Sequence, residues 1–153
     1  MQIKLISFSL AALLAPATLG ATTSTSVSVS VSVSVSVSYD QAYDNGPASL
    51  STVSCSDGSH GLLTKGYTTF DSLPSFPNIG GTSAVPGWNS DQCGTCWSLA
   101  YNGTTINVLA VDSAKNGWNV ALQAMNNLTG GQAQQLGRVD AVATLVDSSL
   151  CGL

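Results

Sequence analysis

The feature that most constrains this chain is the pair Cys93 and Cys96, separated by two residues in the segment GWNSDQCGTCW. Such a pair can be a redox centre, half of a zinc site, or two anchors of separate disulfides. Two other cysteines, Cys55 and Cys151, bring the total to four, which allows three pairings. The compartment in which the protein matures decides among these readings.

The first residues have the pattern of a secretory signal peptide. Lys4 precedes an apolar run over residues 5–14, and small residues follow over 15–21. The run is too short to span a bilayer, and no longer one follows it. We therefore assign residues 1–21 to a cleaved signal peptide and expect a secreted, extracellular protein without a membrane span. Its cysteines would mature in an oxidising compartment.

Secretion and spacing together favour structural disulfides over metal or redox chemistry. A zinc site needs a second group of ligands, and the chain offers only His60 and distant cysteines. A thioredoxin-like pair begins a helix after a strand, whereas Cys96 leads directly into the strand-like WSLAY. The sequence therefore predicts two disulfides, no metal and no cofactor.

The charge of the mature chain limits its partners. Without Lys4, three cations oppose eight aspartates and there is no Glu, so the formal net charge is −5. A surface with so few cations does not favour nucleic acid or anionic lipid. Polar contacts would come mainly from hydroxyl and amide side chains, which suit an uncharged ligand rich in hydroxyl groups.

Residues 22–38 form a low-complexity arm in which Val and Ser alternate. Alternation with a period of two is a strand signal, but a slip of two residues regenerates the same faces, so the register is not fixed. We expect a disordered or slipping extended arm whose last residues, 35–39, lead into the first strand. A solvated, O-glycosylated spacer is favoured over a self-association strand. Residues 39–153 fit one domain.

The rest of the sequence has mostly short strand patterns punctuated by glycine. Strands are predicted at residues 49–55, 96–101, 105–111 and 139–146, with a tight hairpin turn at Asn102-Gly103. Short helices are predicted at 120–128 and 132–136, the second ended by Gly137. This spacing favours a small β-barrel. Asn102 and Asn127 begin glycosylation sequons, and the tight turn gives Asn102 the poorer access.

Several ordered motifs carry a family resemblance: CSDGSHGLLTKGYTTF, LPSFPNIGG, GWNSDQCGTCW, TINVLAVDSA, ALQAMNNLTGGQA and a terminal CGL. Over residues 35–153 the chain resembles the cerato-platanin family of secreted fungal proteins, from which the long Val/Ser arm departs. The resemblance implies an all-β fold with small helices, a six-stranded double-psi β-barrel like that of expansins and barwin-like proteins. It also implies the disulfides Cys55–Cys93 and Cys96–Cys151, each contributing roughly 4 kcal/mol by loop closure.

The resemblance also implies a function. The family is associated with chitin and N-acetylglucosamine oligomers, loosening of the cell wall without hydrolysis, elicitation of plant defence, and self-assembly at interfaces. We therefore expect a carbohydrate-binding elicitor at the fungal cell wall, with polysaccharide and a host plant receptor as partners. The first alternative is a self-associating coat protein at the wall or an interface.

By the same resemblance, Asp112 occupies the position of the barrel aspartate shared with expansins and the related endoglucanases. It is expected to lie in a shallow groove that also contains Asp57, Trp88 and Asn89. Aromatic rings stack on the apolar faces of sugars, while amides and carboxylates orient the hydroxyls. Trp88 is expected to be exposed and Trp118 to be a second platform. The residues also have simpler readings, since Asp112 and Asp57 can accept hydrogen bonds from turn amides.

Catalysis is less well supported than binding. A glycoside hydrolase needs two carboxyl groups roughly 5 to 9.5 Å apart across the bound sugar. The candidate partners of Asp112 are Asp57, Asp91 and Asp40, and nothing in the sequence places any of them opposite it. We therefore expect no catalytic residues and no enzyme activity, with a weak glycoside hydrolase as the second alternative.

Overall fold

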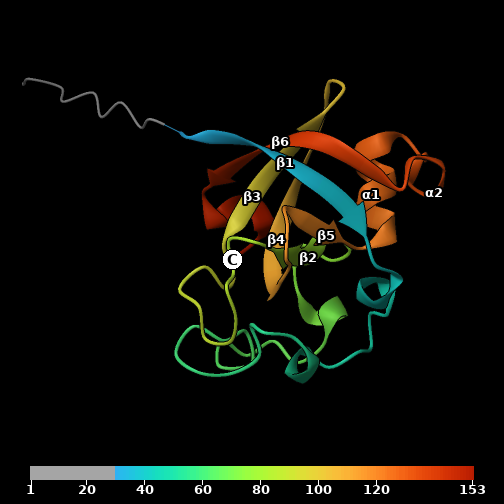
Figure 1. Ribbon diagram of the computed structural model, residues 1–153. Helices are drawn as coiled ribbons and strands as arrows, with labels where there is room; N and C mark the ends of the chain where they lie inside the picture. Colours follow the sequence, from blue (N-terminus) through green and yellow to red (C-terminus); the bar gives the residue numbers. More distant parts are fainter. Residues whose placement is uncertain (1–29) are drawn as a thin grey trace, which may run out of the picture.

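The computed structural model describes residues 30–153, and six strands dominate it (Figure 1). The predicted signal peptide and the arm residues 22–29 lie outside the described residues. The strands are β1 Ser32–Tyr39, β2 Ile79–Thr82, β3 Cys96–Tyr101, β4 Thr104–Ser113, β5 Trp118–Val120 and β6 Arg138–Val146. They form a closed barrel in the order β1-β5-β2-β4-β3-β6, which confirms the expected six-stranded barrel.

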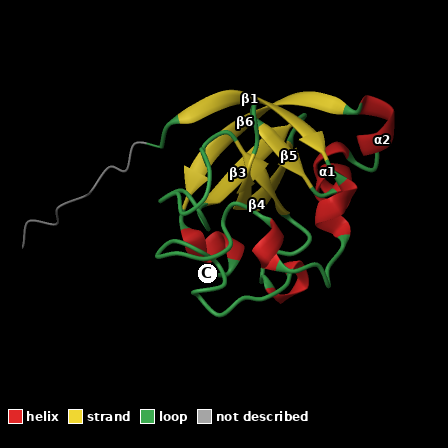
Figure 2. Ribbon diagram, turned by 60° about the horizontal axis from the view of Figure 1, so that its bottom comes forward, coloured by secondary structure: helices red, strands yellow, loops and turns green. Residues whose placement is uncertain are grey.

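The helices are small and lie outside the barrel (Figure 2). Two are α-helices, α1 Leu122–Thr129 and α2 Ala133–Leu136, close to the predicted ranges. Four are 3-10 turns, η1 Gln41–Asp44, η2 Leu50–Thr52, η3 Phe70–Ser72 and η4 Ser148–Cys151. Gly130 ends α1 in the left-handed region, at φ +64°. The irregular chain between β1 and β3 lies below the barrel in Figure 1.

The barrel core is built from buried residues of all six strands. Val37, Leu99, Val108 and Trp118 are all at most 1 % exposed, and Met125 of α1 closes one side. The hairpin of β3 and β4 turns at Asn102 and Gly103 as predicted. Strands β3, β4 and β6 lie within two residues of the ranges predicted for them.

The strand predicted at residues 49–55 is wrong. This segment forms the 3-10 turn η2 and a loop, and its one bridge pairs Ser49 with Thr69. The Ser49 hydroxyl caps the turn by accepting a hydrogen bond from the Ser51 amide at 3.2 Å. Val53 and Cys55 are buried without a sheet ladder. Buried and more exposed residues alternate in this loop, and this alternation gives a sequence pattern like that of a strand.

Two strands, β2 and β5, were not predicted. In β2, a Cβ atom on Gly80 would lie 2.6 Å from the Asn119 carbonyl oxygen of β5, so glycine permits the close approach of the two backbones. Short segments with glycine carry little strand signal. In addition, β1 begins at Ser32, three residues before the expected start.

Both disulfides expected from the family resemblance are confirmed. Cys55 is bonded to Cys93 with a Cα–Cα distance of 5.3 Å, and Cys96 is bonded to Cys151 at 5.7 Å. The two residues of the Cys-x-x-Cys therefore belong to different bridges. One bridge fixes the loops below the barrel, and the other ties β3 to the C-terminal turn η4.

Candidate functional site

Trp88 is a solvent-facing aromatic side chain held in place by a carboxylate. It is 64 % exposed, and its indole Nε1 donates a hydrogen bond of 2.6 Å to Oδ1 of the exposed Asp57. A hydrogen bond to an ionised acceptor is shorter and stronger than one between neutral groups. The ring is therefore oriented while much of its surface remains open to a ligand.

Asn89 joins the same two loops. Its side-chain Oδ1 accepts hydrogen bonds from the His60 amide at 3.0 Å and from the Ser59 hydroxyl at 3.3 Å. Its backbone has φ +57°, a left-handed conformation that asparagine tolerates better than most residues. Gly58 lies against it, and a Cβ there would come within 2.5 Å of Asn89 Oδ1. The contact requires glycine at position 58.

The Cys55–Cys93 disulfide ties these loops together covalently. Cys55 lies two residues before Asp57, and Cys93 follows Trp88 by five residues. The Cys55 amide also donates to the carbonyl of Val111 in β4 at 3.2 Å, which fixes the loop to the barrel. The structure thus brings together Asp57, Trp88 and Asn89, three of the five predicted sugar-binding residues.

Asp112 is a half-buried hydrogen-bond acceptor at the end of β4. Its Oδ1 accepts from the amides of Ser54 and Ser113, both at 2.8 Å, and its Oδ2 accepts from the Tyr43 hydroxyl at 3.1 Å. The simpler reading of this residue, as an acceptor for turn amides, therefore describes its contacts. Through Ser54, Asp112 holds the loop that carries Asp57, and Asp57 in turn holds Trp88.

Tyr43 is buried beside Asp112, and its pKa is raised. Burial of the phenol is the largest cause, followed by the negative charge of Asp112 and the hydrogen bond to it, with a smaller effect of Asp40. Each of these causes disfavours the phenolate. Tyr43 therefore keeps its proton at neutral pH and acts as a donor that orients the Asp112 carboxylate.

Trp118 is not a surface platform, and that prediction is wrong. Its side chain is 1 % exposed and packs edge-on against Trp97, with 6.2 Å between ring centroids. The surrounding Asn-Gly-Trp-Asn looks like a turn, but only Gly117 turns, and Trp118 already belongs to β5. Trp97 is partly buried and packs against the core.

Asp40 and Asp91, the other two candidate carboxylates, each have hydrogen-bond partners of their own. Asp40 caps η1 by accepting a hydrogen bond from the Ala42 amide at 2.9 Å. Asp91 is exposed and accepts from the side chain of its neighbour Gln92. Among residues 30–153, no group of three or more potential metal-ligating side chains is assembled.

Two adjoining hollows share the residues that follow Asp112 in the chain. The first, of about 430 Å³, is lined by Ser38, Ser113, Ala114, Lys115, Asn116, Asn119 and Arg138. The second, of about 300 Å³, shares residues 113–115 and adds Ser83, Val85 and Pro86, which brings it to within two residues of Trp88 in the chain. Sequence reasoning missed these residues because β1, β5 and β6 assemble them from distant positions. The only local sequence signal for the residues of these hollows was the polar run after Asp112.

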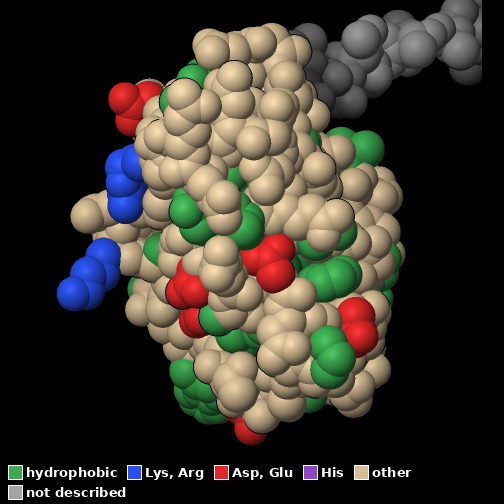
Figure 3. Space-filling model, turned by 90° about the vertical axis from the view of Figure 1, so that its right-hand side faces the viewer, with side chains coloured by type: hydrophobic (Ala, Val, Ile, Leu, Met, Phe, Trp, Pro, Cys, Tyr) green, Lys and Arg blue, Asp and Glu red, His purple; other side chains and the backbone are tan. Residues whose placement is uncertain are grey.

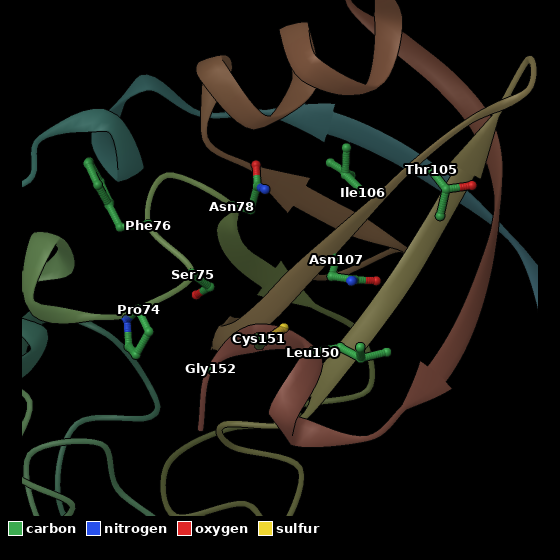
Figure 4. Close-up of a pocket in the computed structure, with 10 residues that line it drawn as sticks. All are labelled: Pro74, Ser75, Phe76, Asn78, Thr105, Ile106, Asn107, Leu150, Cys151 and Gly152. Carbon is green, nitrogen blue, oxygen red and sulfur yellow. The ribbon is translucent and has the colours of Figure 1, made fainter.

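The charges are unevenly distributed over the surface. Figure 3 shows scattered carboxylates among neutral and apolar groups, with cationic groups together at one edge. A further hollow, of about 530 Å³, has no charged side chain in its lining (Figure 4). It lies between β4, the loop at residues 74–78 and η4, and it contains none of the predicted sugar-binding residues.

The helices described for this chain, within residues 30–153, are each too short or too polar to cross a membrane.

The two glycosylation sequons, at Asn102 and Asn127, lie in different structural settings. Asn102 is exposed at the tip of the β3–β4 hairpin, in the tight turn for which poorer access is expected. The sequon of Asn127 ends at Thr129, which is buried and donates to the Met125 carbonyl at 2.7 Å.

Comparisons with known proteins agree on one family. A family model described as "Cerato-platanin" matches residues 35–153. "Allergen Asp f 15" of Aspergillus fumigatus is 50 % identical over 109 residues, covering 71 % of each chain. The crystal structure of cerato-platanin 3 from M. perniciosa has a TM-score of 0.76 and 51 % identity, covering 79 % of this chain and all of the other. The solution structure of "the fungal elicitor Cerato-Platanin" has a TM-score of 0.67 and 42 % identity, covering 76 % and 96 %.

Proposed function

Because this chain belongs to the cerato-platanin family, we propose that it is an extracellular carbohydrate-binding protein without catalytic activity. Its ligands are chitin-type oligomers of N-acetylglucosamine. At the fungal cell wall it loosens polysaccharide contacts without hydrolysis, and toward a plant host it acts as an elicitor of defence. The observation that carries this proposal is the exposed, anchored indole of Trp88.

The Trp88 platform has the chemistry that a sugar ring needs. An indole face offers a flat apolar surface against the CH groups of a pyranose. Because Asp57 already fixes the ring, binding loses little side-chain freedom, which favours affinity. The neighbouring Asn89 and the polar hollows along residues 113–115 supply groups for sugar hydroxyls and acetamido groups. An extended oligomer fits such an open surface better than a small enclosed ligand.

The hydrogen bonds of the carboxylates support a binding role. A hydrolase needs one carboxyl group as proton donor and a second as base or nucleophile, both directed at the glycosidic bond. Asp112 uses both oxygens within the protein, for Ser54, Ser113 and Tyr43. Asp57 accepts from Trp88. Internal hydrogen bonds that hold Asp112 and orient Trp88 favour a structural and binding role for these carboxylates over a catalytic one.

Calorimetric titration with soluble chitin and cellulose oligomers, beside a reducing-sugar assay, tests the proposal. We expect chitin oligomers to bind with no sugar released. Trp88→Ala should lose roughly five- to tenfold in affinity, since stacking on an aromatic ring contributes about 1 to 1.5 kcal/mol. Leu150→Ala removes another exposed side chain, in the hollow of Figure 4, and should bind normally.

Two outcomes would reject the proposal. Sugar release that disappears in Asp112→Asn would favour the weak hydrolase. Unchanged affinity in Trp88→Ala would reject the site.

Elicitor activity is tested separately by applying the wild-type protein and Trp88→Ala to plant leaves and measuring the oxidative burst. One solved relative is described as a fungal elicitor, which supports this part of the proposal.

A coat protein at the wall or an interface is the second candidate. It is favoured by exposed apolar side chains near the start of β1, where Val31 is 70 % and Val33 is 45 % exposed. Deletion of residues 22–31 removes most of the arm and leaves β1 intact. Loss of film formation at an air–water interface, with sugar binding retained, would support the coat. Film formation by the deleted protein would reject a role of the arm.

A further inference from the structure

Strand β1 has one edge that is only partly paired. Along β6 its register runs from Ser32↔Thr144 to Ser38↔Arg138, whereas along β5 it covers only residues 37–39. Within residues 30–153, no strand pairs with the second edge of residues 32–36. Ser32, Val33 and Ser34 are exposed. Their backbone groups on that edge can therefore pair with another strand.

The same part of β1 carries an apolar surface. Val37 is fully buried, but the valines toward the start of the strand leave the core, so Val33 is 45 % and Val31 is 70 % exposed. On the neighbouring strands, Leu145 of β6 is 49 % exposed and is the register partner of Trp97 in β3. Val31, Val33, Trp97 and Leu145 line a hollow of about 340 Å³, here termed the apolar shelf. Figures 1 and 2 show β1 running beside β6 toward this end.

The sequence at this edge lacks the features that normally prevent pairing. Proteins protect edge strands with lysine, proline, bulges or inward charges. Residues 22–38 contain only Thr, Ser and Val. The same composition lacks Gly, Pro, Asn and Asp, the residues that most strongly favour a tight turn, and Ser favours one only weakly, so a hairpin back onto the edge is disfavoured. The sequence thus points to a strand from another molecule.

We propose that the free edge of β1 binds the same edge of a second copy of this chain, antiparallel and about a twofold axis. Directly opposed residues of an antiparallel pair share a face. In an alternating Val/Ser strand, every register that places Val opposite Val also places Ser opposite Ser. The edge is therefore complementary to itself, and both apolar shelves lie on one face of the joined sheet.

This pairing closes as a dimer. Within residues 30–153, each copy contributes one free edge of β1, because β6 occupies the other edge. An interface that uses the same patch on both copies leaves none over for a third. Two contacts confine the paired stretch within residues 32–36: Trp118 is already the register partner of Val37, and Gly117 lies against the backbone of Ser36, where a Cβ on the glycine would clash with the Ser36 carbonyl oxygen. A short interface of this kind gives a weak, concentration-dependent dimer.

Sedimentation velocity of the secreted chain, from micromolar to millimolar concentration, tests the dimer. We expect a monomer–dimer equilibrium and no larger species. Amide hydrogen exchange should show residues 32–36 becoming more protected as the concentration rises. Val33→Lys places a charge on the shelf, opposite an apolar residue of the second copy. It should weaken association by roughly tenfold or more.

Val142→Lys is the matched control. Val142 is 46 % exposed, nearly the same as Val33, and it lies on β6 as the register partner of Ser34, on the other face from the shelf. This variant should associate like the wild type. A protein that stays monomeric at all concentrations would overturn the proposal. So would equal losses in the two variants, or protection that rises elsewhere but not at residues 32–36. Neither sedimentation velocity nor amide hydrogen exchange in this experiment depends on sugar binding.

Discussion

The indole Nε1 of Trp88 lies 2.6 Å from Oδ1 of Asp57, although the two residues are 31 positions apart in the chain. The hydrogen bond joins two loops that the Cys55–Cys93 disulfide also joins. In solution a lone exposed tryptophan would sample several rotamers. Here the carboxylate selects one of them, so the proposed sugar platform exists before a ligand arrives.

Asp57→Ala should release the indole and weaken binding of chitin oligomers by about two- to tenfold, because the ring must then be ordered on binding. Asp57→Asn keeps an acceptor oxygen and should lose less. Calorimetric titration measures both. Asp91→Ala removes another exposed aspartate from the same region and should bind normally. If Asp91→Ala and Asp57→Ala lose affinity equally, general surface charge and not the Trp88 contact is responsible.

The two disulfides should contribute similarly to stability but differently to binding. Their loops of 38 and 55 residues each correspond to roughly 4 kcal/mol of unfolding free energy by loop closure. Replacing Cys55 and Cys93 by serine should also reduce affinity for chitin oligomers, because this bridge joins the loops of Asp57 and Trp88.

The matched variant replaces Cys96 and Cys151 by serine. It should be destabilised to urea by a comparable amount and yet bind normally once folded. Urea titration followed by calorimetry below the unfolding transition separates the two effects. Equal losses of affinity in both double variants would show that binding depends on overall stability alone.

Asp44 should stabilise α1 from a distance. Its carboxylate accepts hydrogen bonds from the amides of Leu122 and Gln123, at 2.7 and 2.9 Å, whereas the helix's own N-cap residue, Ala121, has no side-chain acceptor. Asp44→Ala should lower the free energy of unfolding by about 1 to 2 kcal/mol. Asp140→Ala, at an exposed position on β6, should change it little. Thermal or urea unfolding compares them, and equal effects would argue against the cap.

The raised pKa of Tyr43 makes stability depend on alkaline pH. The fold favours the protonated phenol, so this contribution is fully present below the ordinary tyrosine pKa, near pH 10, and is lost as the pH rises through the higher value in the folded protein. Tyr43→Phe should be less stable than wild type at pH 7, by about 1 kcal/mol for the lost hydrogen bond. Above pH 10 this difference should shrink.

Urea unfolding at pH 7 to 11 measures that difference. Tyr101→Phe, at a half-buried position on β3, serves as the control and should keep a constant difference from wild type. A constant difference in Tyr43→Phe as well would mean that the phenol beside Asp112 does not couple to folding in this range.

Trp88 and Trp118 show what could be predicted for the site. Both follow a glycine in a polar segment, and both were expected at the surface. Trp88 lies in a loop and is exposed, whereas Trp118 begins β5 and is buried against Trp97. Pairing of β5 with β1 and β2 decides this difference. A three-residue strand has no periodicity long enough to reveal its inward face.

The sequence by itself determined the barrel class, the strands β3, β4 and β6, the small helices, and, through family resemblance, both disulfides. These depend on local alternation, turn residues and motifs that are contiguous in the chain. Only the tertiary structure decided that Asp57 holds Trp88 and that Tyr43 orients Asp112. It also decided that, among the described residues, no strand pairs with the second edge of residues 32–36 in β1. These features join residues far apart in sequence, and their energies depend on distance and burial, which no local pattern encodes.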